Sequence, residues 1–208
     1  MVSGLDALKR LRQGNRRFAD DIRGTGKGKL GTRRIELMDG QNPIAIILGC
    51  SDSRVPAELI FDQGLGDLFV IRVAGNIVAP SQVGSVEFAA ERYGSRLVVV
   101  LGHSLCGAVQ ATLEELERPG QQRSPNLGAI VGRIRPAVET LMEADWGDSQ
   151  DALLRAAIRS NTRASANHLR NASPTLEKMI RENELLIVGA EYSLETGIVD
   201  FFDVPPGQ

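Results

Sequence analysis

The chain has 208 residues, the length of one ordinary domain, and we expect a single domain over residues 1–208. Its 42% hydrophobic and 24% charged residues exclude a disordered chain and a collagen-like repeat. A formal charge of −2 gives no electrostatic reason to bind nucleic acid or anionic lipid. No apolar run approaches the about 18 residues of a membrane span. The first residues also lack the apolar region of a signal peptide, so we expect a cytoplasmic protein.

The N-terminal segment predicts an amphipathic helix. Its apolar residues recur at roughly helical spacing, at Leu5, Leu8, Leu11 and Phe18. Residues 23–31 mix glycine with basic residues and indicate a connection. This stretch lacks the Gly-Lys-Ser/Thr signature of a phosphate-binding loop. We therefore expect an N-terminal helical arm over residues 1–35.

The rest of the chain alternates between short aliphatic runs and segments of helical composition. The aliphatic runs predict buried strands at residues 44–48, 68–73, 97–101 and 185–188, and an edge strand closes the chain at 197–202. Helices are predicted at residues 81–93 and 108–116, and a later helical block is broken at Ser173-Pro174. There serine can cap, and proline can begin, a new helix that runs to about Glu182. This alternation predicts an α/β fold with a mainly parallel central sheet flanked by helices.

Both cysteines of the chain and one of its two histidines lie at or just beyond the ends of two predicted strands. Cys50 follows one strand and His103 follows another, each directly after a glycine, and Cys106 comes three residues after His103. Because the carboxyl ends of parallel strands meet at one edge of a sheet, we expect the three side chains to converge. A single Cys or His at a strand end is usually an ordinary buried residue, but the three together favour a metal site. Two sulfurs and one nitrogen favour zinc and leave one coordination position open.

The turn after Cys50 contains an acidic and a basic residue that can pair. Asp52 and Arg54 are two positions apart, and a charge-assisted, bidentate pair between them would place a carboxylate beside the candidate ligand. The alternative is a helix N-cap, in which Asp52 or Ser53 caps a helix that begins near Pro56. His168 lies in a predicted helix without a thiol or acidic neighbour, and we expect an ordinary surface or core residue there.

Two motifs resemble those of the β-class carbonic anhydrases: Cys50-Ser-Asp-Ser-Arg54 and Gly102-His-Ser-Leu-Cys-Gly107. The resemblance extends to residues 66–76 and 85–90, and more loosely from about Leu5 to Phe202. It implies an α/β fold with a four-stranded parallel core and a fifth edge strand, assembled as a homodimer or homotetramer. It also implies a carbonate dehydratase, a zinc lyase with one Zn²⁺ per subunit. This enzyme would convert carbon dioxide reversibly to bicarbonate and a proton by means of zinc-bound hydroxide.

The resemblance also assigns roles to individual residues. The family's zinc ligands match Cys50, His103 and Cys106, and its catalytic Asp-Arg pair matches Asp52 and Arg54. A glutamine that in part of the family reaches toward the substrate pocket, often that of the dimer mate, matches Gln41, and the pocket phenylalanine matches Phe69. Two further pocket positions, often Val and Tyr in the family, are Ala74 and Phe88 here. Without the resemblance, these four would be read as ordinary turn or core residues.

Some members of the family close the site by letting the aspartate, here Asp52, bind zinc as a fourth ligand. Those members carry a tryptophan at the position of Ile47, so the sequence favours the open form.

Three alternative functions use the same residues. The scaffold could hydrolyse carbonyl sulfide or carbon disulfide, in which case pocket shape would select the substrate. It could also be a non-catalytic protein that binds zinc or bicarbonate, if the fourth position is permanently blocked. A redox pair of Cys50 and Cys106 is disfavoured because the sequence has no Cys-x-x-Cys motif.

Overall fold

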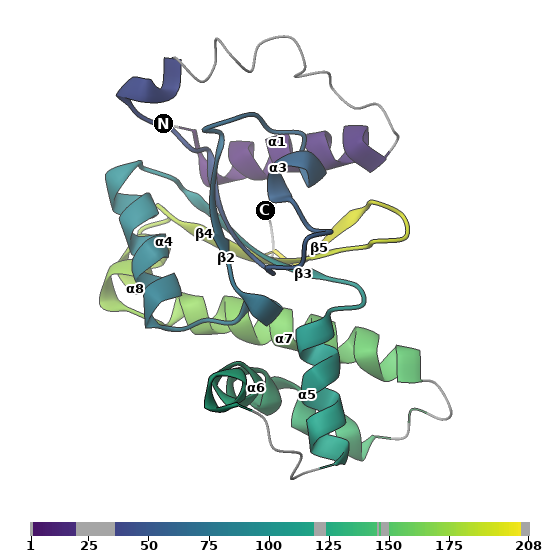
Figure 1. Cartoon of the computed structure of the whole chain (residues 1–208). Helices are drawn as coiled ribbons and strands as arrows, with labels where there is room; N and C mark the ends of the chain where they lie inside the picture. Colours follow the sequence, from purple (N-terminus) through teal and green to yellow (C-terminus); the bar gives the residue numbers. More distant parts are fainter. Residues whose placement is uncertain (1, 20–35, 119–123, 145, 147–149, 205–208) are drawn as a thin grey trace.

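A computed structural model describes residues 2–19, 36–118, 124–144, 146 and 150–204. Within these residues the chain forms a five-stranded sheet (Figure 1), with strands in the order β2-β1-β3-β4-β5. Their bounds are β1 (Ala45–Gly49), β2 (Leu68–Arg72), β3 (Leu97–His103), β4 (Leu186–Tyr192) and β5 (Val199–Asp203). The first four strands of this order pair in parallel, and β5 pairs antiparallel to β4 at the edge. The predicted four-stranded parallel core with one edge strand is therefore confirmed.

Helices cover both faces of the sheet (Figure 1). On one face lie α1 (Gly4–Ala19) and α3 (Ala57–Ile60), and on the other lie α4 (Pro80–Arg92), α8 (Pro174–Arg181) and the long α7 (Gln150–Arg170). Next to α7 lie α5 (Gly107–Glu117) and α6 (Pro125–Val138), which share a third apolar cluster with it. The described residues also form three short 3-10 helices: η2 (Leu37–Asp39), η3 (Ala74–Asn76) and η4 (Glu139–Glu143).

The burial of the central strands explains their unbroken aliphatic sequence. Every residue of β1 and of β3 is buried, because helices cover both faces of the sheet. Alternate residues of β1 enter opposite clusters: Ile47 packs with α1 and α3, and Ile46 packs with α4 and α8. A period-two pattern would not appear in such a strand, so the continuous apolar run was the correct signal.

The predicted helices agree with the structure in position, with small changes at their ends. The break at Ser173-Pro174 is confirmed, because the Ser173 side chain accepts a hydrogen bond from the Leu176 backbone N–H and Pro174 begins α8. The N-terminal helix is also confirmed as α1, and its residues Ala7, Leu8 and Leu11 are buried in the core of the same chain. The remainder of the expected arm, residues 20–35, lies outside the described residues. The single domain over residues 1–208 stays a prediction.

Two strands are longer than their apolar runs predicted. β3 continues through Gly102 to His103, and β4 continues to Tyr192, because these residues pair with each other across the two strands. In the part of the chain that the structure describes, we find no helix that combines the length and the apolar character needed to cross a membrane.

Candidate metal centre

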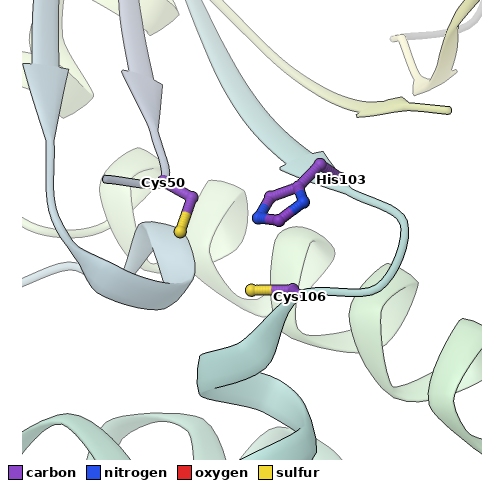
Figure 2. A group of neighbouring side chains, drawn as sticks. All are labelled: Cys50, His103 and Cys106. Atoms are coloured by element: carbon purple, nitrogen blue, oxygen red, sulfur yellow. The ribbon is translucent and has the colours of Figure 1, made fainter. Parts of the chain in front are cut away.

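Three potential ligands converge at the carboxyl edge of the sheet (Figure 2). Cys50 follows β1, His103 ends β3, and Cys106 precedes the first residue of α5. Their two Sγ atoms and one imidazole nitrogen all lie within 4.8 Å of one another, and all three residues are buried. The convergence predicted from the strand ends is therefore confirmed.

The hydrogen bonds of His103 leave one ring nitrogen directed into the cluster. Nδ1 lies 3.0 Å from the backbone oxygen of Ser104, and a proton on Nδ1 makes this contact a hydrogen bond. Nε2 then carries a lone pair, is buried, and finds no hydrogen-bond partner among the described residues. Because a buried polar atom without a partner is costly, this nitrogen is suited to bind a cation.

The two thiols have opposite tendencies to ionise. A hydrogen bond from the Cys106 thiol, together with one from the backbone N–H of Gly75, lowers the pKa of Cys50 to about 4. The pKa of Cys106 is raised, because its proton is held by the Cys50 sulfur and because the group is buried. Cys50 is therefore the more acidic of the two thiols, and a cation bound between the two sulfurs would take the place of the proton that they share.

The turn between β1 and α3 places a carboxylate beside the three ligands. Arg54 donates from Nε to Asp52 Oδ1 at 2.9 Å and from Nη2 to Asp52 Oδ2 at 2.7 Å. These bonds hold the pKa of Asp52 well below its usual range. Asp52 Oδ2 lies 4.0 Å from His103 Nε2, so the ionised carboxylate faces the cluster.

The alternative role of Asp52 as a helix cap is wrong. The N-cap of α3 is Pro56, and no side chain caps this helix. Asp52 Oδ1 instead accepts the backbone N–H of Arg54 at 2.9 Å. The carboxylate thus accepts hydrogen bonds within its own turn, four residues before the N-cap, and makes none to the N–H groups of α3.

Sequence reasoning assigned no role to Arg72, which holds this turn from the end of β2. Its Nε donates to the backbone oxygen of Cys50 at 2.9 Å, and its Nη2 donates to that of Asp52 at 2.5 Å. Arg72 lies within the segment that carries the family resemblance. No spacing rule, however, shows that a side chain of one strand binds the backbone after another.

The expected pocket residues fall into two separate places. Ala74 is half-buried in η3, directly before Gly75, whose N–H contacts Cys50.

Phe69 instead pairs in register with Ile46. Ile46 lies four residues before Cys50, and hence about 13 Å away from it along the strand direction. The rings of Phe69 and Phe88 lie 6.3 Å apart and both contact Tyr93, whose hydroxyl accepts a hydrogen bond from Gln41 at 3.1 Å. Within one chain, Ala74 is therefore the neighbour in sequence of a residue that contacts Cys50, whereas Gln41, Phe69 and Phe88 gather around Tyr93.

The other histidine is not part of the centre. His168 is exposed on α7, as expected for an ordinary surface residue.

Comparison with known proteins identifies the family. Residues 45–199 match the family model described as carbonic anhydrase. The chain is 38% identical over 195 residues to carbonic anhydrase of Mycolicibacterium smegmatis, covering 93% of this chain and 91% of that protein. It is 37% identical over 194 residues to carbonic anhydrase 2 of Mycobacterium tuberculosis, covering 92% of this chain and 89% of that protein.

Solved structures agree with this assignment. The β-carbonic anhydrase CcaA superposes with a TM-score of 0.75 at 25% identity, over 92% of each chain. The β-carbonic anhydrase CafA of Aspergillus fumigatus superposes with a TM-score of 0.73 at 25% identity, over 89% of each chain. A sequence match that spans the sheet and the Cys-His-Cys cluster, together with the same fold, shows that the chain belongs to the β-carbonic anhydrase family of lyases.

Proposed function

We propose that the protein is a zinc-dependent carbonic anhydrase that interconverts carbon dioxide and bicarbonate. The observation that carries this proposal is the buried, unpartnered Nε2 of His103, close to the sulfurs of Cys50 and Cys106. Family membership supports the reaction, and the donor set supports the metal. Two thiolates and one imidazole are soft ligands that favour Zn²⁺ over Mg²⁺ or Ca²⁺.

Three protein ligands leave one position of a tetrahedral ion open, as catalytic zinc sites require. When bound, zinc would supply Lewis-acid activation of water at near-neutral pH. Cys50 and Cys106 would both be deprotonated in this state, and the bond from His103 Nδ1 to Ser104 would keep Nε2 directed at the ion.

Asp52 and Arg54 would orient the attacking water molecule. The Asp52 carboxylate is ionised and faces the cluster, so it can accept a proton or a hydrogen bond from water on that side. The attacking oxygen then keeps a lone pair directed away from Asp52, toward carbon dioxide. Ala74, half-buried and directly before Gly75 in the sequence, would form part of the apolar wall of this pocket.

We further propose the open form of the site as the active one. Arg54 engages both carboxylate oxygens of Asp52, which competes with any bond from Asp52 to the metal. The same side chain also donates to the backbone oxygen of Leu105 at 3.3 Å. Arg54 therefore connects the Asp52 turn to the turn that carries His103 and Cys106.

We propose a homodimer, which can assemble further into a tetramer, because the aromatic cluster is incompletely covered. Phe88 is 51% exposed, and Phe69 and Tyr93 are half-buried beside it. Exposed apolar side chains grouped in this way are typical of a contact surface. With this surface at the dimer interface, Gln41, Phe69 and Phe88 would complete the substrate pocket of the partner.

We propose the cytoplasm as the location, because the centre requires reduced cysteines. Cys50 and Cys106 are free thiols in the structure, and a reducing compartment keeps them so.

Metal analysis combined with assays of carbon dioxide hydration across pH tests the function. We expect about one zinc per chain, loss of activity on chelation, and recovery when zinc is restored. Full activity after complete chelation would overturn the proposal. Carbonyl sulfide and carbon disulfide belong in the same assay, because faster turnover of either would assign the site to a different substrate. A cobalt-substituted protein whose spectrum does not respond to azide would indicate a blocked, non-catalytic site.

A further inference from the structure

A buried asparagine on α7 connects to the metal centre through a backbone segment. Asn161 is 2% exposed, and its Nδ2 donates to the backbone oxygen of Gly75 at 2.9 Å. The backbone N–H of Gly75 in turn donates to Cys50 Sγ at 3.4 Å. Two hydrogen bonds therefore lead from the side chain of Asn161 to a sulfur of the candidate metal centre.

The conformation of Gly75 is closely constrained. Its φ is 70° and its ψ is 18°, the left-handed region that glycine adopts without strain. A Cβ atom at this position would lie 2.7 Å from Ile134 Cδ1 and 3.2 Å from Ala108 Cβ, so the surrounding side chains fit a residue without one. The bond from Asn161 holds the peptide that follows Gly75, and the bond to Cys50 holds the peptide that precedes it. The two bonds together define this turn.

A hydrogen bond to a thiolate changes how the sulfur binds a metal. The N–H group withdraws electron density from the sulfur and stabilises its charged form, so the sulfur donates less strongly to a bound cation. It also orients the remaining lone pairs of the sulfur. A residue that fixes the position of this N–H group can therefore tune the electronic character of the site without touching the metal.

We propose that Asn161 is a positioning residue of the metal centre, which acts through Gly75 to maintain the N–H···S hydrogen bond on Cys50. This inference rests on the proposed function, since it assumes that Cys50 binds a metal ion. It places a determinant of the site on α7, outside both sequence motifs.

A purely structural role for Asn161 predicts a different result. Buried carbonyl groups need a hydrogen-bond donor, and Asn161 could serve only to satisfy that of Gly75. Its loss would then lower the melting temperature and leave the metal–sulfur bonds unchanged. A spectroscopic measurement on the sulfurs therefore distinguishes the two roles.

The test uses the full chain with Co²⁺ in place of zinc, because sulfur-to-cobalt charge-transfer absorption reports directly on thiolate donation. Asn161→Leu removes the amide at similar side-chain volume. Asn161→Ser is a second variant in case the leucine variant does not fold, because the serine side chain is too short to donate to the Gly75 oxygen. The matched control is Asn15→Leu. Asn15 is 3% exposed, and its Nδ2 donates to the backbone oxygens of Ile60 and Gly197. It belongs to α1, and none of its bonds reaches the metal centre.

We expect the charge-transfer band of both Asn161 variants to shift to longer wavelength at an unchanged cobalt content. The Asn15 variant should keep the wild-type band although its melting temperature falls. Asn161 variants that melt earlier but retain the wild-type band would overturn the positioning role and leave the proposed function intact. A wild-type chain that shows no cobalt–thiolate absorption would overturn both.

Discussion

Arg54 binds both oxygens of the Asp52 carboxylate, with Nε 2.9 Å from Oδ1 and Nη2 2.7 Å from Oδ2. Asp52 and Arg54 lie two and four residues beyond Cys50, and the Asp52 side chain is only 18% exposed. A bidentate pair of this kind fixes the carboxylate in orientation as well as in charge. Asp52 is thus held as an oriented carboxylate beside the candidate metal centre, which is the arrangement that the proposed open form requires.

Replacement of Asp52 by asparagine should separate metal binding from catalysis. The variant Asp52→Asn keeps the three metal ligands but cannot accept the proton, so we expect wild-type zinc content and a loss of activity on the order of 10²-fold or more. Stopped-flow assays of carbon dioxide hydration measure the loss. The control is Asp62→Asn, which alters another arginine-paired carboxylate, 2.7 Å from Arg17 Nε. Near-normal turnover of the Asp52 variant would remove this residue from the mechanism.

Loss of the arginine should favour the closed form of the site. In Arg54→Gln the carboxylate of Asp52 loses its bidentate partner and becomes free to occupy the open coordination position. We expect lower activity and a weaker response of the cobalt spectrum to azide, because the anion must displace a carboxylate. The matched control, Arg17→Gln, removes the partner of Asp62. An azide response as strong as that of the wild type would show that Arg54 does not keep Asp52 off the metal.

Removal of a thiolate ligand should deplete the metal. We expect Cys106→Ser to lower the zinc content to below about one tenth of the wild-type value, since even the loss of an outer partner of a ligand costs about 10- to 100-fold in affinity. Elemental analysis of the purified protein measures the content. The control is His168→Gln, which changes the exposed histidine on α7 and should retain full zinc. Full zinc content in the Cys106 variant would show that this residue is not a ligand.

A charge in the aromatic cluster should disrupt self-association. Phe88→Asp would place an unpaired carboxylate in the proposed interface, and a loss of about 2 kcal/mol there weakens association by about 30-fold. Sedimentation equilibrium should show a shift toward monomer, and activity should fall as the partner's pocket residues separate from the site. The control is Leu127→Asp on α6, because Leu127 is 52% exposed and Phe88 is 51% exposed. An unchanged oligomer in the Phe88 variant would place the interface elsewhere.

The pH dependence of stability should reveal the cost of burying Glu191. Burial raises the pKa of this carboxyl, although Arg159 lies 3.7 Å away and opposes the change. A raised folded-state pKa means that ionised Glu191 destabilises the fold. This penalty is absent below the unfolded-state pKa, grows as the pH rises through the folded-state pKa, and is complete above it.

We therefore expect Glu191→Gln to melt a few degrees higher than the wild type at pH 8, with the difference disappearing toward pH 4. Arg159 keeps an ion pair in this variant, because Asp200 lies 2.7 Å from it. Differential scanning calorimetry across pH provides the comparison. The control is Glu184→Gln, at a side chain that is 51% exposed in its pair with Arg96 and should show no such trend. A difference that grows toward acid pH would contradict the assignment.

Much of the sheet could be predicted because the strands are buried on both faces. The aliphatic runs located β1, β2 and β3 to within two residues. The reason is clearest for β1 and β3, in which every residue is buried, because a strand covered on both faces must be apolar throughout. For β4, the same rule predicted an end at residue 188, four residues before the observed end of the strand. Gly189 interrupts the apolar run, but β4 continues to Tyr192 because its residues pair with β3 and β5.

The amino-acid sequence by itself determined the three candidate ligands and their meeting place. Their positions follow from local rules, since Cys50 and His103 follow buried strands and Cys106 lies one turn further on. The role of Asp52 stayed open at that level, because a carboxylate in a turn can cap a helix or bind an arginine equally well.

Only the tertiary structure decided which distant groups meet at the site. Arg72 binds the backbone of the Cys50 turn from another strand, and Asn161 reaches Gly75 across 86 positions of the sequence. The structure also showed that Phe69 and Phe88 lie apart from Cys50 within one chain. Periodicity and motif spacing predict which residues lie close together within one helix, strand or turn. Contacts between elements depend instead on how whole helices and strands pack, because each such contact is selected by the burial of many other side chains at once.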